Sequence, residues 1–159
     1  MTIQVNETIP EVNVKIVNNG EVSETNTTEL FASGKSVLFG LPGAFTPTCS
    51  KAHLPGFVVN ADAIKEKGVE RIVCMSVNDA FVMGAWAEAS NAEAITMLAD
   101  GNCAFAKALG LDFDGTGFGM GQRSQRFAAI IDNGKLTHLF VEGPGEFEVS
   151  SAEHVLSQL

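Results

Sequence analysis

Residues 35–57 of the chain are KSVLFGLPGAFTPTCSKAHLPGF. The first seven of them, Lys35–Leu41, form a short apolar run that is typical of a strand buried in a sheet. Across Cys49–Lys67 apolar residues recur at helical spacing, although Pro55 is expected to bend or break the helix. A second apolar run, Arg71–Val77, follows. A strand, a helix and a strand of this length predict a crossover that joins two parallel, buried strands.

The segments on either side extend this pattern. Further strands are predicted at Val12–Val17 and Ile95–Leu98, and further helices at Ala80–Ala89, Cys103–Leu109 and Ser150–Leu159. Two apolar runs, Phe127–Ile131 and Leu136–Val141, flank the turn Asn133-Gly134 and predict an antiparallel hairpin. The sequence therefore predicts an α/β domain with helices on a mixed sheet. Because it has no linker, repeat or block of like charge, we expect a single domain over residues 1–159.

Composition narrows the class of protein. The chain has 159 residues, of which 45% are apolar, and a net charge of −9. That charge argues against binding to nucleic acid, which needs a clustered basic face. No run approaches the roughly 18 consecutive apolar residues of a membrane-spanning helix. The first fifteen residues also lack the basic start and apolar run of a signal peptide, so we expect a cytoplasmic protein with no membrane partner.

The chain has three cysteines, Cys49, Cys74 and Cys103, and no CxxC pair. An odd number without pairing favours reduced thiols and disfavours a disulfide framework, a zinc site or a CxxC-type disulfide oxidoreductase. Cys103 follows the turn-forming residues Asp100-Gly101-Asn102, so we expect it to be the more exposed of the two later cysteines.

Cys49 is the strongest candidate for a reactive group. It follows Pro42-Gly43 and Thr46-Pro47-Thr48, where a helix should begin, and either threonine is suited to cap that helix. A cysteine in the first helical turn faces unpaired backbone N–H groups and the positive end of the helix dipole, and both favour a thiolate. The alternative, a small buried residue, is the ordinary fate of a free cysteine. Polar, turn-forming flanks favour the reactive interpretation.

A low pKa alone does not make a thiol a fast nucleophile. As a thiol becomes more acidic its thiolate fraction rises, but its intrinsic nucleophilicity falls and nearly cancels the gain. Hydrogen-bond donors must therefore stabilise the charge that develops in the transition state. Candidate donors are the Thr46 hydroxyl, the loop amides and an arginine. We favour Arg126, which opens the strand predicted at Phe127–Ile131, although a salt bridge at the end of a sheet is the alternative role.

These residues carry a family resemblance. PGAFTPTC at 42–49 resembles the P-x-x-x-T-x-x-C motif of peroxiredoxins, and FGLPGAFTPTCSKAHLPGF at 39–57 is similar to the subfamily of mammalian type-five and plant type II enzymes. Further similarity lies in VCMSVNDAFVMGAW (73–86), LADGN (98–102) and RSQRF (123–127). FVEGPGEFEVSSAE (140–153) resembles the C-terminal stretch of bacterial members.

The resemblance implies a thioredoxin-like three-layer fold and a peroxidase that reduces hydrogen peroxide and organic hydroperoxides. Cys49 would be the peroxidatic cysteine and would become a sulfenic acid. Pro42 would shield it, Thr46 would hydrogen-bond the thiolate and the peroxide, and Arg126 would favour the thiolate and bind the peroxide. No metal or organic cofactor is implied. A homodimer is implied as well, with Phe45 and the segment 80–86 as candidate interface residues.

The chain departs from the mammalian enzymes at Glu148-Val149-Ser150-Ser151, where those enzymes carry a resolving cysteine. Cys74 lies 25 residues after Cys49, the spacing of the second cysteine in plant type II enzymes. It either resolves the sulfenic acid or is inert, and its apolar strand favours the inert role. We therefore expect an external thiol as reductant, either glutathione, with or without glutaredoxin, or thioredoxin.

A redox sensor that relays oxidation to a protein partner is the competing functional hypothesis, because it would use the same thiol. His53 lies one helical turn after Cys49 and is expected to make a structural hydrogen bond. The glycine-rich segment Gly115–Gly121 does not follow a clear strand, so we expect a loop and not a dinucleotide site.

Overall fold

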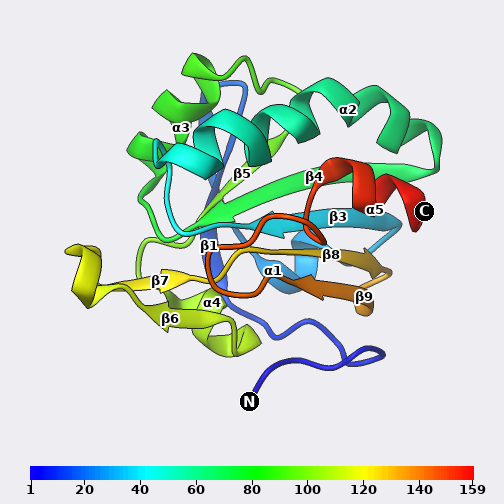
Figure 1. Ribbon diagram of the computed structural model, residues 1–159. Coiled ribbons are helices and arrows are strands. Elements are labelled where there is room, and N and C mark those ends of the chain that lie inside the picture. Colours follow the sequence, from blue (N-terminus) through cyan, green and yellow to red (C-terminus); the bar gives the residue numbers. More distant parts are fainter.

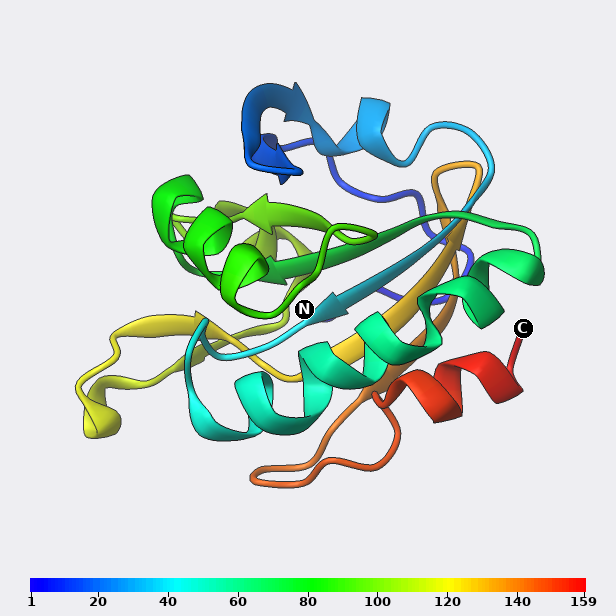
Figure 2. The ribbon, with the colours of Figure 1, turned by 90° about the horizontal axis from the view of Figure 1, so that it is seen from above.

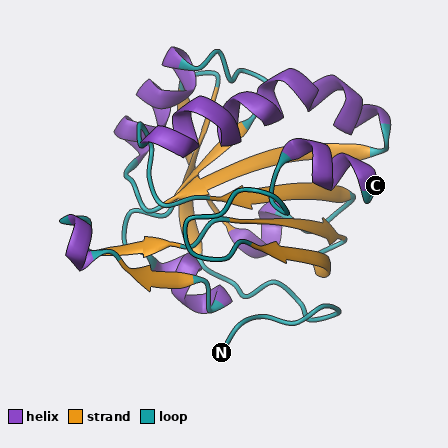
Figure 3. Cartoon of the chain, viewed as in Figure 1, coloured by secondary structure: helices purple, strands orange, loops and turns teal.

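The structure is a computed structural model that describes residues 1–159. Its centre is a seven-stranded mixed sheet with the strand order β2-β1-β5-β4-β3-β8-β9 (Figures 1 and 3). The strands of this sheet are β1 (Asn13–Asn18), β2 (Glu21–Asn26), β3 (Lys35–Gly40), β4 (Val69–Ser76), β5 (Thr96–Ala99), β8 (Phe127–Asp132) and β9 (Lys135–Val141). The predicted α/β architecture with a mixed, helix-covered sheet is confirmed.

Helices cover both faces of the sheet, which gives three layers. One face carries the long helix α2 (Leu54–Glu66), α3 (Ala80–Ala89) and α5 (Ala152–Ser157) (Figure 2). The other face is covered by α4 (Ala104–Leu109) and by the N-terminal segment. Phe31, which directly follows the short helix α1 (Thr27–Leu30), packs there as well. Each face has its own apolar cluster, because successive side chains of a strand point to opposite faces.

The two predicted central strands lie side by side and parallel. In β3 and β4 the residues Phe39 and Cys74 are partners, and β3 pairs on its other edge with β8 in an antiparallel sense. Val37 and Phe39 face the α2 side, whereas Leu38 faces the α4 side, so this strand is buried on both faces. The β3–α2–β4 crossover predicted from the apolar runs is therefore present.

The predicted helix across residues 49–67 is continuous but changes its pitch. Cys49–His53 form a π-helical turn, η1, in which the Leu54 amide donates to the Cys49 carbonyl five residues earlier. Pro55 does not break the helix, because η1 runs directly into α2. It lies in the first turn of α2, where the hydrogen-bond pattern changes from π to α. The π turn therefore lies between the Cys49 loop and the regular part of α2, and such turns are frequent at functional sites.

The other elements agree with the sequence patterns in most places. The β8–β9 hairpin turns at Asn133 and Gly134, whose φ angles are 49° and 81°, as an Asn-Gly turn requires. Strand β2 was not predicted, because its side chains are all exposed or half-buried and leave no apolar pattern. The glycine-rich segment forms the short helix η2 (Thr116–Phe118) at the tip of a hairpin of β6 (Asp112–Asp114) and β7 (Gln122–Ser124).

None of these helices is both long enough and apolar enough to span a bilayer.

Candidate active site

Cys49 lies where the chain leaves the central sheet. Strand β3 ends at Gly40, and a loop through Pro42 and Thr46 leads to η1, whose first residue is Cys49. Its side chain has no exposed surface and packs in the apolar cluster on the α2 side. The position of Cys49 at the start of the helical segment is the one predicted.

Arg126 reaches Cys49 from the neighbouring strand. Its Nη2 donates to the Cys49 Sγ over 3.1 Å. The antiparallel register explains the approach: Gly40 at the end of β3 pairs with Phe127 at the start of β8, so the residue before Phe127 lies beside the Cys49 loop. The structure thus brings together the thiol and the arginine that sequence analysis selected, and their chemistry is that of a charge-assisted hydrogen bond.

The two threonines of the loop do not cap the helix, so that expectation is wrong. The Thr48 side chain makes no capping hydrogen bond, and the Thr46 hydroxyl donates to the Gly43 carbonyl over 2.6 Å. Thr48 has helical backbone angles, φ −66° and ψ −36°, which are unsuited to a side-chain cap. The Thr46 carbonyl instead accepts from the Ser50 amide, which continues the helix backwards over Cys49.

A second arginine, not selected from the sequence, holds the Pro42 end of the loop. The Nη1 of Arg123 donates to the Pro42 carbonyl over 3.2 Å, and its Nε donates to the Met120 carbonyl over 2.9 Å. A Cβ at Gly43 would lie 2.8 Å from that Nη1, so a side chain at this residue would displace the Arg123 guanidinium. Arg123 therefore fastens the loop to the β6–β7 hairpin and does not contact the sulfur.

The middle of the loop is fixed from the sheet and from α3. The Asn78 Oδ1 accepts from the Ala44 amide over 3.0 Å and from the Ser76 hydroxyl over 2.6 Å. The Trp86 indole Nε1 donates to the Ser50 hydroxyl over 3.0 Å, which joins α3 to η1. No local signal in the sequence marks these contacts, because each joins residues whose closeness only the fold creates.

His53 forms the far side of the Arg126 guanidinium. Its Nδ1 lies 2.9 Å from Arg126 Nη1, and its Nε2 lies 3.0 Å from the Ser150 carbonyl oxygen. Burial, reinforced by the Arg126 charge, lowers the pKa of His53 from 6.5 to about 3. The predicted structural hydrogen bond of His53 is thus present, and a second contact joins the ring to the arginine.

Glu142 organises the C-terminal loop over this group. Its Oε2 accepts from the Glu148 amide, the Ser150 amide and the Ser150 hydroxyl at 2.6 to 2.8 Å. Burial alone would raise the pKa of Glu142, but these hydrogen bonds outweigh it and hold the pKa below its ordinary value. The loop also places Phe147 over Arg126, with the ring centre 5.9 Å from Cζ.

A cavity of about 440 Å³ opens beside this arrangement. Pro42, Thr48 and Arg126 line it, together with Phe113 and Phe118 from the β6–β7 hairpin segment. The segment Glu142–Glu146 completes the wall. Cys49 itself is buried, but Arg126, which donates to its sulfur, forms part of the cavity wall.

The other two cysteines are buried. Cys74 has no exposed surface on β4, and burial, together with the nearby Cys49, raises its pKa well above the ordinary value. Cys103 is the more exposed of the two, as expected, but its relative exposure is only 3%, and it packs in the apolar cluster on the α4 side. With φ at 62°, Cys103 adopts a left-handed conformation directly before α4, and its side chain points inward.

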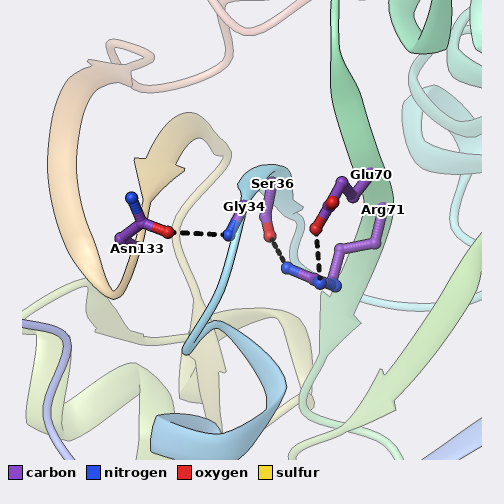
Figure 4. A network of polar contacts seen from close by, with 5 residues as sticks. All are labelled: Gly34, Ser36, Glu70, Arg71 and Asn133. Carbon is purple, nitrogen blue, oxygen red and sulfur yellow. Dashed lines mark hydrogen bonds and ion pairs between the residues drawn. The ribbon is translucent and has the colours of Figure 1, made fainter.

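Arg71, the third arginine, lies at the opposite end of β3 and β4 from Cys49. It donates to the Ser36 hydroxyl over 2.6 Å and pairs with Glu70 over 3.2 Å, in the network shown in Figure 4. Asn133 of the hairpin turn joins this end of the sheet through its bond to the Gly34 amide (Figure 4). This network is structural and far from the candidate site.

Comparison with known proteins identifies the family. The Redoxin family profile matches residues 4–156. Peroxiredoxin-2D of Arabidopsis thaliana is 43% identical over 99% of this chain and 98% of its own length. The chain belongs to the peroxiredoxin family. A crystal structure of reduced Prx3 from Vibrio vulnificus in complex with H₂O₂ is 54% identical, with a TM-score of 0.94 over 99% of each chain.

The comparison also supports the subfamily. Peroxiredoxin 5 from Alvinella pompejana is 32% identical, with a TM-score of 0.85 over 98% of this chain and 96% of that one. The predicted likeness to type-five and plant type II peroxiredoxins and the thioredoxin-like fold are confirmed. This peroxiredoxin is a thiol-dependent peroxidase, the activity that the family and its relatives share.

Proposed function

We propose that Cys49 is the peroxidatic nucleophile of this peroxidase and that Arg126, Thr46 and Pro42 assist it. The observation that carries the proposal is the Arg126 Nη2 to Cys49 Sγ hydrogen bond of 3.1 Å, made by an arginine that also lines a cavity. The guanidinium is always charged and can donate to both the sulfur and a peroxide oxygen. Pro42 lines the cavity and shields the sulfur from bulk water.

The chemistry follows from this arrangement. The Cys49 thiolate attacks the terminal oxygen of a hydroperoxide ROOH, so that an S–O bond forms as the O–O bond breaks. The sulfur is oxidised to a sulfenic acid, Cys–SOH, and the leaving RO⁻ takes a proton from water to become ROH. Donors near the sulfur stabilise the charge on RO⁻ as it develops. The Thr46 hydroxyl serves in this role once it turns from the Gly43 carbonyl toward the peroxide.

The sulfenic acid returns to the thiol through two molecules of an external thiol. The first displaces water and forms a mixed disulfide with Cys49, and the second releases the disulfide and restores the Cys49 thiol. The proposed reductant is glutathione, with or without glutaredoxin, or thioredoxin. The enzyme itself removes peroxides in the cytoplasm and so acts as an antioxidant. Cys74 is a poor resolving residue because its side chain is fully buried in β4 and its thiol resists ionisation.

The chain acts as one domain and forms a homodimer in this proposal. Phe45 and Phe81 support the dimer, because 56% and 86% of these large apolar side chains are exposed. The Phe45 ring centre lies 6.4 Å from that of Trp86, so the exposed Phe45 ring lies beside α3, the helix that also carries Phe81. An edge of this kind near the active site suits a second copy of the chain.

The nucleophile is tested with two cysteine variants. Cys49→Ser should abolish peroxide consumption, whereas Cys74→Ser should keep the first turnover, measured by loss of one equivalent of hydrogen peroxide per chain. Non-reducing peptide mass spectrometry after that turnover should find no Cys49–Cys74 disulfide. Peroxide consumption by Cys49→Ser would end the proposal for the nucleophile, and a rapid, quantitative disulfide would end the proposal for an external thiol. Steady-state assays with glutathione, glutaredoxin and thioredoxin then identify the reductant.

A further inference from the structure

We infer that His53 is a positioning residue for peroxide reduction, and that its unprotonated Nδ1 aims the Arg126 guanidinium at Cys49. This inference rests on the proposed roles of Cys49 and Arg126. It adds a third side chain to the pair, one that touches neither the sulfur nor the peroxide.

The hydrogen-bond partners decide which nitrogen of His53 carries the proton. Arg126 can only donate, so the Nδ1 that lies 2.9 Å from its Nη1 must accept. The Ser150 carbonyl can only accept, so the Nε2 that lies 3.0 Å from it must donate. His53 is therefore the neutral Nε2–H tautomer. Its burial and the adjacent positive charge hold its pKa at about 3, so it stays neutral at the pH of a cell.

The guanidinium is a rigid plane, and this makes His53 an orienting group. Nη1 is bound to His53 and Nη2 to Cys49, so fixing one nitrogen sets the direction of the other. The imidazole cannot rotate away, because the rings of Phe39, Phe57 and Phe147 enclose it with centres at 5.0, 5.7 and 5.2 Å. Donors held in this way need no rearrangement as charge develops on the peroxide.

A neutral acceptor also leaves the arginine its full charge. A carboxylate in this place would orient the guanidinium but would neutralise it. The nearest carboxylate, Glu142, is instead occupied by hydrogen bonds from Ser150 and Glu148. The charge that attracts the thiolate and the departing oxygen is thus directed by His53 and not shared with an anion.

Two substitutions separate this role from a structural one. In His53→Asn the side-chain oxygen takes the place of Nδ1 and can accept from Arg126, but the bond to Ser150 is lost. In His53→Gln the side-chain nitrogen takes the place of Nε2 and can donate to Ser150, but the acceptor for Arg126 is lost. A structural role predicts that both variants lose peroxide reactivity in step with their stability. A positioning role predicts that they diverge.

The experiment measures the second-order rate with hydrogen peroxide, by competition with a haem peroxidase, and the guanidinium unfolding midpoint of each variant. We expect His53→Gln to lower the rate by about 10- to 100-fold, as the loss of an orienting group around a reactive centre does. We expect His53→Asn to stay within about threefold of the wild type despite a lower midpoint, because the acceptor is kept. An unchanged rate in His53→Gln, or a loss in His53→Asn as large as in His53→Gln, would overturn the inference.

A double-mutant cycle adds a test that does not depend on absolute rates. If His53 acts through Arg126, adding His53→Gln to Arg126→Gln should change the peroxide rate little, whereas independent roles would give additive losses. The Cys49→Ser control distinguishes the two proposals. An active Cys49→Ser contradicts the proposed nucleophile, whereas a fully active His53→Gln beside an inactive Cys49→Ser contradicts only the positioning role of His53.

Discussion

Arg126 donates from Nη2 to the sulfur of Cys49 across 3.1 Å, although the two residues are 77 positions apart in the chain. The contact depends on the pairing of β3 with β8, which sets the start of one strand against the end of the other. Because Arg126 directly precedes a strand of the central sheet, its backbone is held in position, and its guanidinium is in place before a peroxide binds.

Arg126→Gln should lower the second-order rate with hydrogen peroxide by at least about 100-fold, since it removes a charged donor to the transition state. Arg71→Gln is the matched control: it removes the same charge at the opposite end of the sheet, where Arg71 binds Ser36 and Glu70. Its rate should equal that of the wild type. Equal rates in all three proteins would exclude Arg126 from the site.

Thr46→Val keeps the shape of the side chain and removes its hydroxyl, which in the structure donates to the Gly43 carbonyl over 2.6 Å. We expect the peroxide rate to fall by about 10-fold or more, because a donor near the departing oxygen is lost. Thr46→Ser keeps the hydroxyl and should restore most of the rate. If Thr46→Ser is as slow as Thr46→Val, the methyl group matters and the hydroxyl does not.

The free energy of unfolding should fall as the pH drops below 6.5, because His53 takes up a proton in the unfolded chain but not in the folded one until about pH 3. Between pH 6.5 and 5 this group alone removes about 2 kcal/mol. Arg126, which opposes protonation, and Glu142, which favours it, are the charged groups that act on His53.

Guanidinium unfolding at pH 7 and pH 5 measures this effect, and His53→Gln is the control. The variant should lose about 2 kcal/mol less than the wild type over that interval. Glu142 interferes little, since its own contribution is lost mainly below the ordinary carboxyl pKa of 4.5 that it has in the unfolded chain, and it is the same in both proteins. Identical losses in the two proteins would show that His53 is not buried in its neutral form.

Phe81→Glu should dissociate the proposed dimer, because it places a charge on an apolar side chain that is 86% exposed on α3. Val59→Glu on α2, where 82% of the side chain is exposed, introduces the same charge outside the proposed interface and should leave the dimer intact. Sedimentation velocity over a range of protein concentrations measures both. A monomeric wild type would contradict the homodimer directly.

The sequence predicted the parts of the site that local patterns encode. Apolar runs identified β3 and β4, and the loop chemistry before the helix marked Cys49. The position of Arg126 at the start of a strand was also visible, because the Asn133-Gly134 hairpin placed that strand in the sheet. Each of these signals lies within a few residues of the feature that it predicts.

Contacts between distant segments were beyond such patterns. The bond from Arg126 to His53 joins residues 73 apart, and the bond from Arg123 to Pro42 joins residues 81 apart. The π turn was missed because apolar spacing does not distinguish a hydrogen bond to the fourth residue back from one to the fifth. Cys103 is far more buried than its turn sequence suggests, because it packs in the apolar cluster on the α4 side, which local sequence does not reveal.

Trp86 gives the protein a built-in optical reporter of its own redox state. The chain has one tryptophan and no tyrosine, and the indole nitrogen is bonded to Ser50, the neighbour of Cys49. Any oxidation of Cys49 that moves η1 must alter or break that bond. Because Trp86 is the one tryptophan, the tryptophan emission of the unlabelled protein reports on this position alone. A step that moves η1 should then change this emission, and stopped-flow fluorescence would measure its rate.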